Sequence, residues 1–277
     1  MGKFIISGFA DEIAKDFNEQ MAHLESLGIQ FFEIRNVDGE NISKLSDEAI
    51  ARVKQIINEK GIKVSAIGSP VGKDSIEEDF SLQLARFHRI IEIAKMLETS
   101  YIRIFSYHTG IENKDEVIFR LKEFVKIAEE NQIILLHENE KGIFGDSAEN
   151  CKYLFDNIVS PNFKGIFDPA NFIQCGVETY PFAYQLLKEH IVYMHIKDAD
   201  ADGTVVPAGT GVGKLKEILT DLSDNQYEGF LSLEPHLGNF AGFSDLGDET
   251  TKMLCESDSG KFTLAYNSLM KILKEIK

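Results

Sequence analysis

The stretch Ile133-Ile-Leu-Leu-His-Glu-Asn-Glu140 places four apolar residues directly before a histidine, two carboxylates and an amide. An apolar run of this length is typical of a strand that is buried on both faces, as in a parallel sheet. Charged side chains are rarely buried unless they are paired or bind a metal. The stretch therefore predicts a buried strand that ends in a polar site.

The same local order recurs along the chain: a short apolar or β-branched run, polar residues at its carboxyl end, and a helical stretch. Successive carboxyl ends are separated by roughly 30 residues, the length of one βα unit. Eight such units predict a closed (β/α)8 TIM barrel, formed by residues 1–277 as a single domain. A doubly wound sheet is the alternative, but Gly2 and Gly8 do not form its glycine-rich turn. The runs are Phe4–Phe9, Ile29–Arg35, Ile62–Gly68, Tyr101–Phe105, Ile133–Glu138, Phe163–Asp168, Ile191–His195 and Gly229–Glu234.

Helices are expected between these runs. Ala49–Lys60 has apolar residues at helical spacing and precedes Gly61, a residue type that commonly ends helices. Ser75 and Glu78 form a capping-box pattern, which predicts a helix that begins there and runs toward Leu97. Further amphipathic stretches are Met21–Leu27, Phe119–Asn131 and Phe262–Ile276.

Composition narrows the class of protein. Hydrophobic residues make up 43% and charged residues 27%, as in ordinary soluble globular proteins. The net charge of −16 gives no general attraction to nucleic acid or to an anionic membrane, so neither partner is expected. There is no signal-peptide pattern and no apolar stretch near the ~18 residues of a membrane span. Three widely spaced cysteines favour a reducing, cytoplasmic location.

Four side chains with metal-binding chemistry come one from each of four successive strand ends: Glu138, Asp168, His195 and Glu234. In a barrel of this kind the active site lies at the carboxyl ends of the strands, where these residues would converge. Three carboxylates and one imidazole suit one divalent cation, Mn²⁺, Mg²⁺ or Co²⁺, with Zn²⁺ as an alternative. Without a cation the carboxylates would repel one another and raise their pKa values.

Motifs on these four strands resemble the xylose isomerase-like superfamily of sugar isomerases and epimerases, which includes ketose 3-epimerases, inosose dehydratases and endonuclease IV. The motifs are Leu136-His-Glu-Asn139, Phe167-Asp-Pro-Ala-Asn171, Met194-His-Ile-Lys-Asp198 and Gly229-Phe-Leu-Ser-Leu-Glu-Pro235. The resemblance covers nearly the whole chain. It implies that Glu138, Asp168, His195 and Glu234 are metal ligands, and that Glu138 and Glu234 also form the catalytic acid/base pair.

The implied function is a metal-dependent sugar or sugar phosphate isomerase or epimerase, in carbohydrate metabolism. Such an enzyme moves a proton next to a carbonyl through an enediolate, with carboxylates as proton carriers. An inosose-type dehydratase is the alternative, because it begins with the same proton removal. An endonuclease IV-like phosphodiesterase would need several more histidines, and a non-catalytic sugar-binding barrel would not need the acid pair.

Further polar residues near the strand ends are candidates for binding a sugar or polyol. Arginine and lysine there could hold a carboxylate or phosphate, or instead form salt bridges with Glu33, Asp198 or another acid. Asn171 stands where many relatives carry histidine; it can hydrogen-bond a hydroxyl but cannot take a proton. The predicted substrate-binding residues are Arg35, Arg103, His108, Glu140, Asn171, Lys197 and His236.

Other features have plainer interpretations. His137 points to the opposite side of its strand from Glu138, which predicts a structural role. Asp11 and Glu12 are expected to cap the first helix. The loop Gly209-Thr-Gly-Val-Gly213 could cradle phosphate, but it lacks a Walker motif and is expected to be a turn.

The segment 237–260 is long for a loop after a strand and is expected to be a lid or a subunit contact. Exposed aromatic residues there would favour a homo-oligomer, a dimer or tetramer. Its apolar residues include Phe240, Phe243, Leu246 and Met253.

Overall fold

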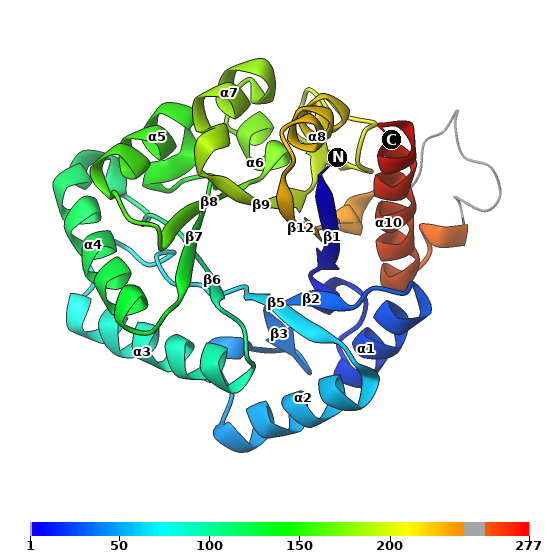
Figure 1. Cartoon of the computed structure of the whole chain (residues 1–277), viewed down its shortest axis with the longest axis horizontal. Helices are drawn as coiled ribbons and strands as arrows, with labels where there is room; N and C mark the ends of the chain where they lie inside the picture. Colours follow the sequence, from blue (N-terminus) through cyan, green and yellow to red (C-terminus); the bar gives the residue numbers. More distant parts are fainter. Residues whose placement is uncertain (1, 241–252, 277) are drawn as a thin grey trace.

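Eight parallel strands form a barrel that is surrounded by helices (Figure 1) in the computed structural model, which describes residues 2–240 and 253–276. The predicted TIM barrel is confirmed, and each strand lies within a few residues of its expected position. The strands are β1 (Lys3–Gly8), β2 (Phe31–Ile34), β5 (Lys63–Ile67), β6 (Tyr101–Ile104), β7 (Ile134–Glu138), β8 (Phe163–Phe167), β9 (Ile191–Ile196) and β12 (Glu228–Leu233).

The strands pair in the order β1-β12-β9-β8-β7-β6-β5-β2. A parallel bridge between Phe9 and Glu33 joins the ends of β1 and β2 and closes the barrel. Because the strands all run in one direction, their carboxyl ends meet at the same end of the barrel. Short antiparallel ribbons follow two of the strands: β3 (Asn36–Val37) with β4 (Glu40–Asn41), and β10 (Asp198–Ala199) with β11 (Val205–Val206).

The helices cover the outside of the barrel. Helix α2 (Asp47–Lys60) ends at Gly61, which has a φ of 65°, as predicted, and Ser46 caps its start by accepting the amide of Ala49. The predicted helix start at Ser75 is wrong, because the Ser75 hydroxyl accepts the amide of Glu77 within a turn and the helix, α3, begins at Phe80 and ends at Met96. The α-helices of the described residues are α1 (Phe17–Ser26), α2 (Asp47–Lys60), α3 (Phe80–Met96, capped by Asp79), α4 (Lys114–Glu130), α5 (Ala148–Asn157), α6 (Pro169–Gln174), α7 (Tyr184–Leu187), α8 (Leu215–Asp224) and α10 (Asp258–Glu275).

The apolar core lies in two places. The larger part fills the space between the strands and the helices, where α1 buries Phe17, Met21 and Leu24 at helical spacing. Burying a side chain of this size stabilises the fold by roughly 1.5–3 kcal/mol. A smaller cluster, Ala66, Leu136, Ile166 and Tyr193, is separate from it. Leu136 lies two residues before Glu138 on β7, so this cluster faces the same side as Glu138 and forms the floor of the polar site.

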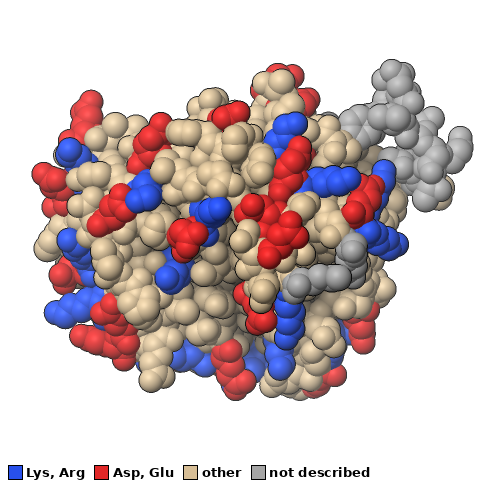
Figure 2. All heavy atoms as spheres, turned by 45° about the horizontal axis from the view of Figure 1, so that its top comes forward, with Lys and Arg blue, Asp and Glu red and all other residues tan. Residues whose placement is uncertain are grey.

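The surface mixes charges of both signs. On the face shown in Figure 2, acidic and basic side chains are interspersed rather than gathered by sign. None of the helices in the described part of the chain is long and apolar enough to cross a membrane.

In segment 237–260, Phe240 is buried and Met253 is 68% exposed, whereas Phe243 and Leu246 lie outside the described residues. The role expected for this segment stays a prediction.

Candidate metal centre

Four buried side chains meet at the carboxyl end of the barrel. Each of Glu138, Asp168, His195 and Glu234 offers one ligand atom, and these atoms all lie within 4.8 Å of one another. The structure thus brings together the four residues expected from the strand ends. Carboxylate oxygens with one imidazole nitrogen are a donor set that fits a divalent cation such as Mn²⁺, Mg²⁺ or Zn²⁺.

The ring of His195 has a fixed orientation. Its Nδ1 atom lies 3.0 Å from Glu138 Oε1 and 3.2 Å from Glu234 Oε2, while Nε2 lies 3.1 Å from Glu33 Oε2. Ser232 Oγ donates to the same Glu33 oxygen at 2.9 Å. Carboxylates that hold the far nitrogen of a metal-binding histidine orient it toward the metal. Glu33 therefore aims Nδ1 at the cluster.

Glu33 was not assigned this role from the sequence. The available signal is a single carboxylate in the apolar run Phe31-Phe32-Glu33-Ile34, a place where a charge needs a partner. Its partner, His195, is 162 residues away and meets it only when the barrel closes. Burial alone would lower the pKa of His195, but the Glu138 and Glu33 carboxylates outweigh it and hold that pKa well above its usual value.

Two arginines hold the outer oxygens of the two glutamates. Arg103 Nη1 lies 3.2 Å from Glu138 Oε2, and Arg35 Nη1 lies 3.2 Å from Glu234 Oε1. Both guanidinium groups also lie over the ring of Phe9, 4.4 Å from its centroid for Arg35 and 5.1 Å for Arg103. Each glutamate therefore has one oxygen on an arginine and the other directed at the centre of the cluster. Arg35 and Arg103 form salt bridges, although with neither Glu33 nor Asp198.

These contacts keep both glutamates ionised. Burial opposes the charge of Glu138, but His195 and Arg103 outweigh burial and lower its pKa to about 2. Burial opposes the charge of Glu234 as well, and the neighbouring Lys197 and His195 hold its pKa well below the usual value. Both groups are therefore available as anionic ligands at neutral pH.

The two carboxylate oxygens of Asp168 have different partners. Its Oδ1 atom accepts the amide of Asn171 at 2.9 Å and so caps α6, while Oδ2 lies 2.8 Å from Lys197 Nζ. Burial raises the pKa of Asp168 to about 7 despite the lysine. The Asn171 side chain donates to Glu138 Oε1 at 3.2 Å. Asn171 and Lys197, both predicted to bind substrate, thus contact the four-residue cluster directly.

The expectation that Asp11 and Glu12 cap the first helix is wrong, because Asp16 caps α1. Asp11 and Glu12 lie in the 3-10 turn η1 (Ala10–Glu12), where the guanidinium of Arg35 reaches both carboxylates. They form salt bridges because the turn after β1 lies beside the end of β2 once the barrel closes.

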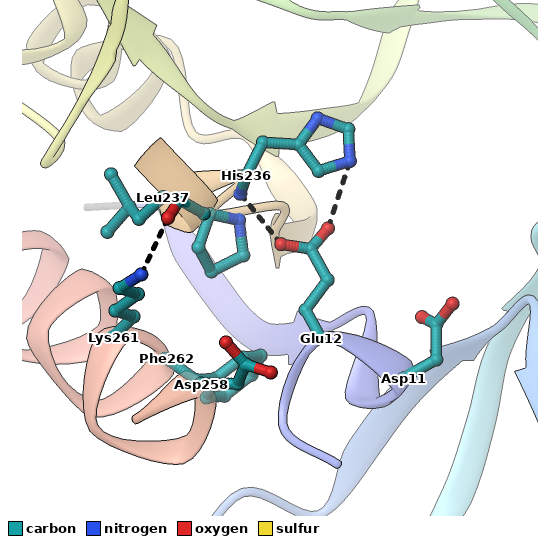
Figure 3. A pocket seen from close by; sticks show the side chains of 9 residues that line it. Asp11, Glu12, His236, Leu237, Asp258, Lys261 and Phe262 are labelled. Atoms are coloured by element: carbon teal, nitrogen blue, oxygen red, sulfur yellow. Dashed lines mark hydrogen bonds and ion pairs between the residues drawn. The ribbon is translucent and has the colours of Figure 1, made fainter. Parts of the chain in front are cut away.

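A pocket of about 330 Å³ lies beside the chain that follows Glu234, and its lining includes Pro235, His236 and Glu12 (Figure 3). At its edge Glu12 accepts the backbone amide of His236 at 2.7 Å and lies 3.1 Å from the imidazole Nε2 atom. Glu12, Glu234 and His236 could form a second metal-binding group, but the Arg35 guanidinium already lies between Glu12 and Glu234.

Two predicted substrate-binding residues stay at the rim. His108 Nδ1 lies 2.9 Å from the carbonyl oxygen of Gly142, and its side chain is exposed. Glu140 Oε2 lies 3.0 Å from Lys73 Nζ. Neither belongs to the group of four that could hold a metal, so a contact with substrate stays a prediction for both.

The loop after β11 has the structure of a turn. The Asp198 carboxylate accepts the amides of Gly209 at 2.9 Å, Gly211 at 3.1 Å and Gly213 at 2.9 Å. A Cβ atom at Gly211 would lie 2.2 Å from the carbonyl oxygen of Ala199, so glycine is required for this close approach. The amides that could have cradled a phosphate are already used by Asp198.

Comparison with known proteins identifies the family. The family model for xylose isomerase-like TIM barrels matches residues 21–252, so the chain belongs to this family. A search of curated proteins gives no significant match.

Solved structures share the fold at low sequence identity. The IOLI protein with bound zinc is 16% identical, with a TM-score of 0.77 over 98% of this chain and 99% of that one. A D-allulose 3-epimerase from Methylomonas sp. in complex with D-allulose is 14% identical, with a TM-score of 0.72 over 99% and 98%. The probable 3-DHS dehydratase AsbF from Bacillus anthracis is 16% identical, with a TM-score of 0.71 over 96% and 99%.

Proposed function

We propose that the protein is a divalent-metal-dependent sugar isomerase or epimerase that moves a proton on the carbon next to a carbonyl. The observation that carries this proposal is the matched pair of glutamates. Glu138 and Glu234 come from strands separated by β8 and β9, and each directs one oxygen at a shared centre while an arginine holds the other. Such a pair could reach one substrate carbon from two sides.

A bound divalent cation would supply Lewis acidity toward the carbonyl and hydroxyl oxygens of the substrate. Glu138, Asp168, His195 and Glu234 would hold it, with Glu33 orienting His195. One glutamate would remove the proton from carbon, and the other would deliver a proton to the opposite face, which inverts that carbon. Return of the proton to the neighbouring carbon would give aldose–ketose isomerisation.

The substrate fits best as an unphosphorylated sugar or polyol. The two arginines that reach the cluster, Arg35 and Arg103, are each paired with carboxylates. The loop amides that would suit a phosphate are hydrogen-bonded to Asp198. A recognition site built in this way favours hydroxyl groups over anions, because an added phosphate would face carboxylates already at close range.

A dehydratase of the inosose type is the second candidate, since it would begin with the same proton removal, and the fold is shared with a probable 3-DHS dehydratase.

An endonuclease IV-like activity is disfavoured. Of the seven histidines, all within the described residues, His195 alone belongs to the four-residue cluster. His137 faces away from it, toward Ser106.

The test is proton NMR in D₂O of the metal-loaded protein with ketoses, aldoses, inososes and their phosphorylated forms. We expect deuterium uptake next to the carbonyl of an unphosphorylated substrate, together with a new epimer or isomer. A product that has lost one water molecule relative to the substrate would select the dehydratase instead. The absence of exchange with every compound in the presence of bound metal would overturn the proton-transfer assignment.

A further inference from the structure

The ammonium group of Lys197 lies inside the candidate metal centre. The lysine is 5% exposed, and its Nζ atom lies 2.8 Å from Asp168 Oδ2 and 3.1 Å from Glu234 Oε2. The Glu234 oxygen is also the one that lies 3.2 Å from Nδ1 of His195. A protein cation therefore contacts the same inward-facing oxygens that a divalent cation would use.

The position of Lys197 on the chain explains how it enters the cluster. It lies two residues after His195, directly after β9 ends at Ile196, so both side chains point into the barrel. The backbone just beyond is anchored, because the Asp198 carboxylate accepts three amides of the glycine loop and the amide of Ala199. The flexible part is the four-carbon stem of the lysine.

An ammonium group and a divalent cation would repel each other strongly at this spacing, because the site is buried and weakly screened. Asp168 Oδ2 has no other polar contact in the described structure than the lysine and, at 3.8 Å, the ring of His195. The lysine thus offsets the repulsion among the three carboxylates, as a metal would.

We propose that Lys197 is a built-in counter-ion of the metal centre, which competes with the divalent cation for Asp168 and Glu234 and withdraws from both when the cation binds. The proposal rests on the metal site of the proposed function. The side chain would then lie toward the open end of the barrel, where its ammonium group can donate to an oxygen of the substrate.

The test measures Mn²⁺ binding by isothermal titration calorimetry to the metal-free full chain at pH 7.5, without substrate. Lys197→Met keeps the length of the apolar stem and removes the charge. We expect Mn²⁺ to bind this variant roughly tenfold more tightly than wild type, which is the effect of removing one close like charge. Lys73→Met is the matched control, because Lys73 pairs with Glu140 rather than with the cluster; its affinity should change by less than about twofold.

The outcomes separate the two proposals. Equal or weaker binding by folded Lys197→Met, while wild type binds Mn²⁺, overturns the competition but leaves the metal site standing. Binding by the variant alone supports the competition strongly. Absence of binding by both proteins overturns the metal-dependent function, and the competition with it. If Lys197→Met does not fold, crystals of wild type with and without Mn²⁺ decide: Lys197 Nζ should lose both contacts in the metal-loaded form, and retention of either one contradicts the proposal.

Discussion

Two fully buried histidines, His137 on β7 and His195 on β9, lie in different surroundings although both strands belong to one barrel. His137 packs outside the barrel, with Nε2 2.9 Å from Ser106 Oγ and its ring edge-on to Phe155. His195 points inside, where its Nδ1 lies 3.0 Å from Glu138 Oε1. One histidine is surrounded by apolar groups and a hydroxyl, the other by carboxylates.

Their pKa values move in opposite directions. Burial lowers the pKa of His137 to about 4, so its ring is neutral at pH 7. Burial acts on His195 in the same sense, but Glu138 and Glu33 reverse the effect and raise its pKa well above 6.5. Two histidines that are buried to the same extent therefore differ in their charge. The partners of a buried histidine decide whether it fills the core or holds a site where a cation can replace a proton.

The largest expected effect is on the rate of proton transfer, when either glutamate of the cluster inside the barrel is replaced. Glu138→Gln and Glu234→Gln should each reduce deuterium exchange next to the substrate carbonyl by about 10²–10⁴-fold, because an amide cannot carry the proton. Proton NMR in D₂O measures this rate at saturating metal. Glu98→Gln is the control, because this glutamate pairs with Lys54 on the surface. Deuterium exchange at the wild-type rate in both Glu138→Gln and Glu234→Gln would contradict the assignment of the acid/base pair.

The outer histidine should act on stability alone. Because the pKa of His137 is depressed to about 4, the unfolded chain binds this proton first as the pH falls. Its contribution to stability is complete above the ordinary pKa of 6.5 and is lost between about pH 6.5 and 4, at a cost of about 3 kcal/mol in the free energy of unfolding.

Urea unfolding at pH 7 and at pH 4.5 measures this loss, and His137→Gln should reduce the difference between the two conditions. NMR titration of the His137 ring in the wild-type protein gives the pKa directly. A ring that titrates near 6.5 in the folded protein would show that the apolar surroundings do not suppress its charge. The metal affinity of the variant should stay close to that of wild type.

The smallest effect is expected for Glu33, the carboxylate that contacts the outer nitrogen of His195 and orients its ring. Glu33→Gln keeps the shape of the side chain but removes the charge that faces Nε2 at 3.1 Å. Metal affinity should fall about 10–100-fold, as is usual when a carboxylate behind a metal-binding histidine is replaced. Calorimetry with Mn²⁺ checks the affinity, with Ser232→Ala as a milder change at the same carboxylate. Unchanged affinity in Glu33→Gln would mean that the ring is oriented by its other contacts.

Much of this arrangement could be predicted from the sequence, because strand positions follow from short apolar runs and side chains alternate along a strand. Alternation predicts that Glu138 points into the barrel and His137 points outward. The strand positions predict that Asp168 lies at the same end of the barrel as Glu138. The start of α3 could not be predicted in this way. Two polar patterns compete there, and the cap of Asp79 forms in preference to that of Ser75.

The contacts of the site were harder to predict because they join residues from distant parts of the chain. Glu33 meets His195, and Arg35 meets Glu234, only when β1 closes the barrel against β2. A charge in an apolar strand signals that a partner exists but does not say which one. The place of Lys197 within the cluster depends on its distances to two carboxylates, and sequence spacing does not supply those distances.

The most direct test of the central claim is anomalous scattering from a crystal of the protein grown with Mn²⁺. We predict one strong peak per chain at bonding distance from carboxylate oxygens of Glu138, Asp168 and Glu234 and from Nδ1 of His195. A peak bound instead by Glu12 and His236, or no peak at the four-residue cluster at saturating Mn²⁺, would contradict the account.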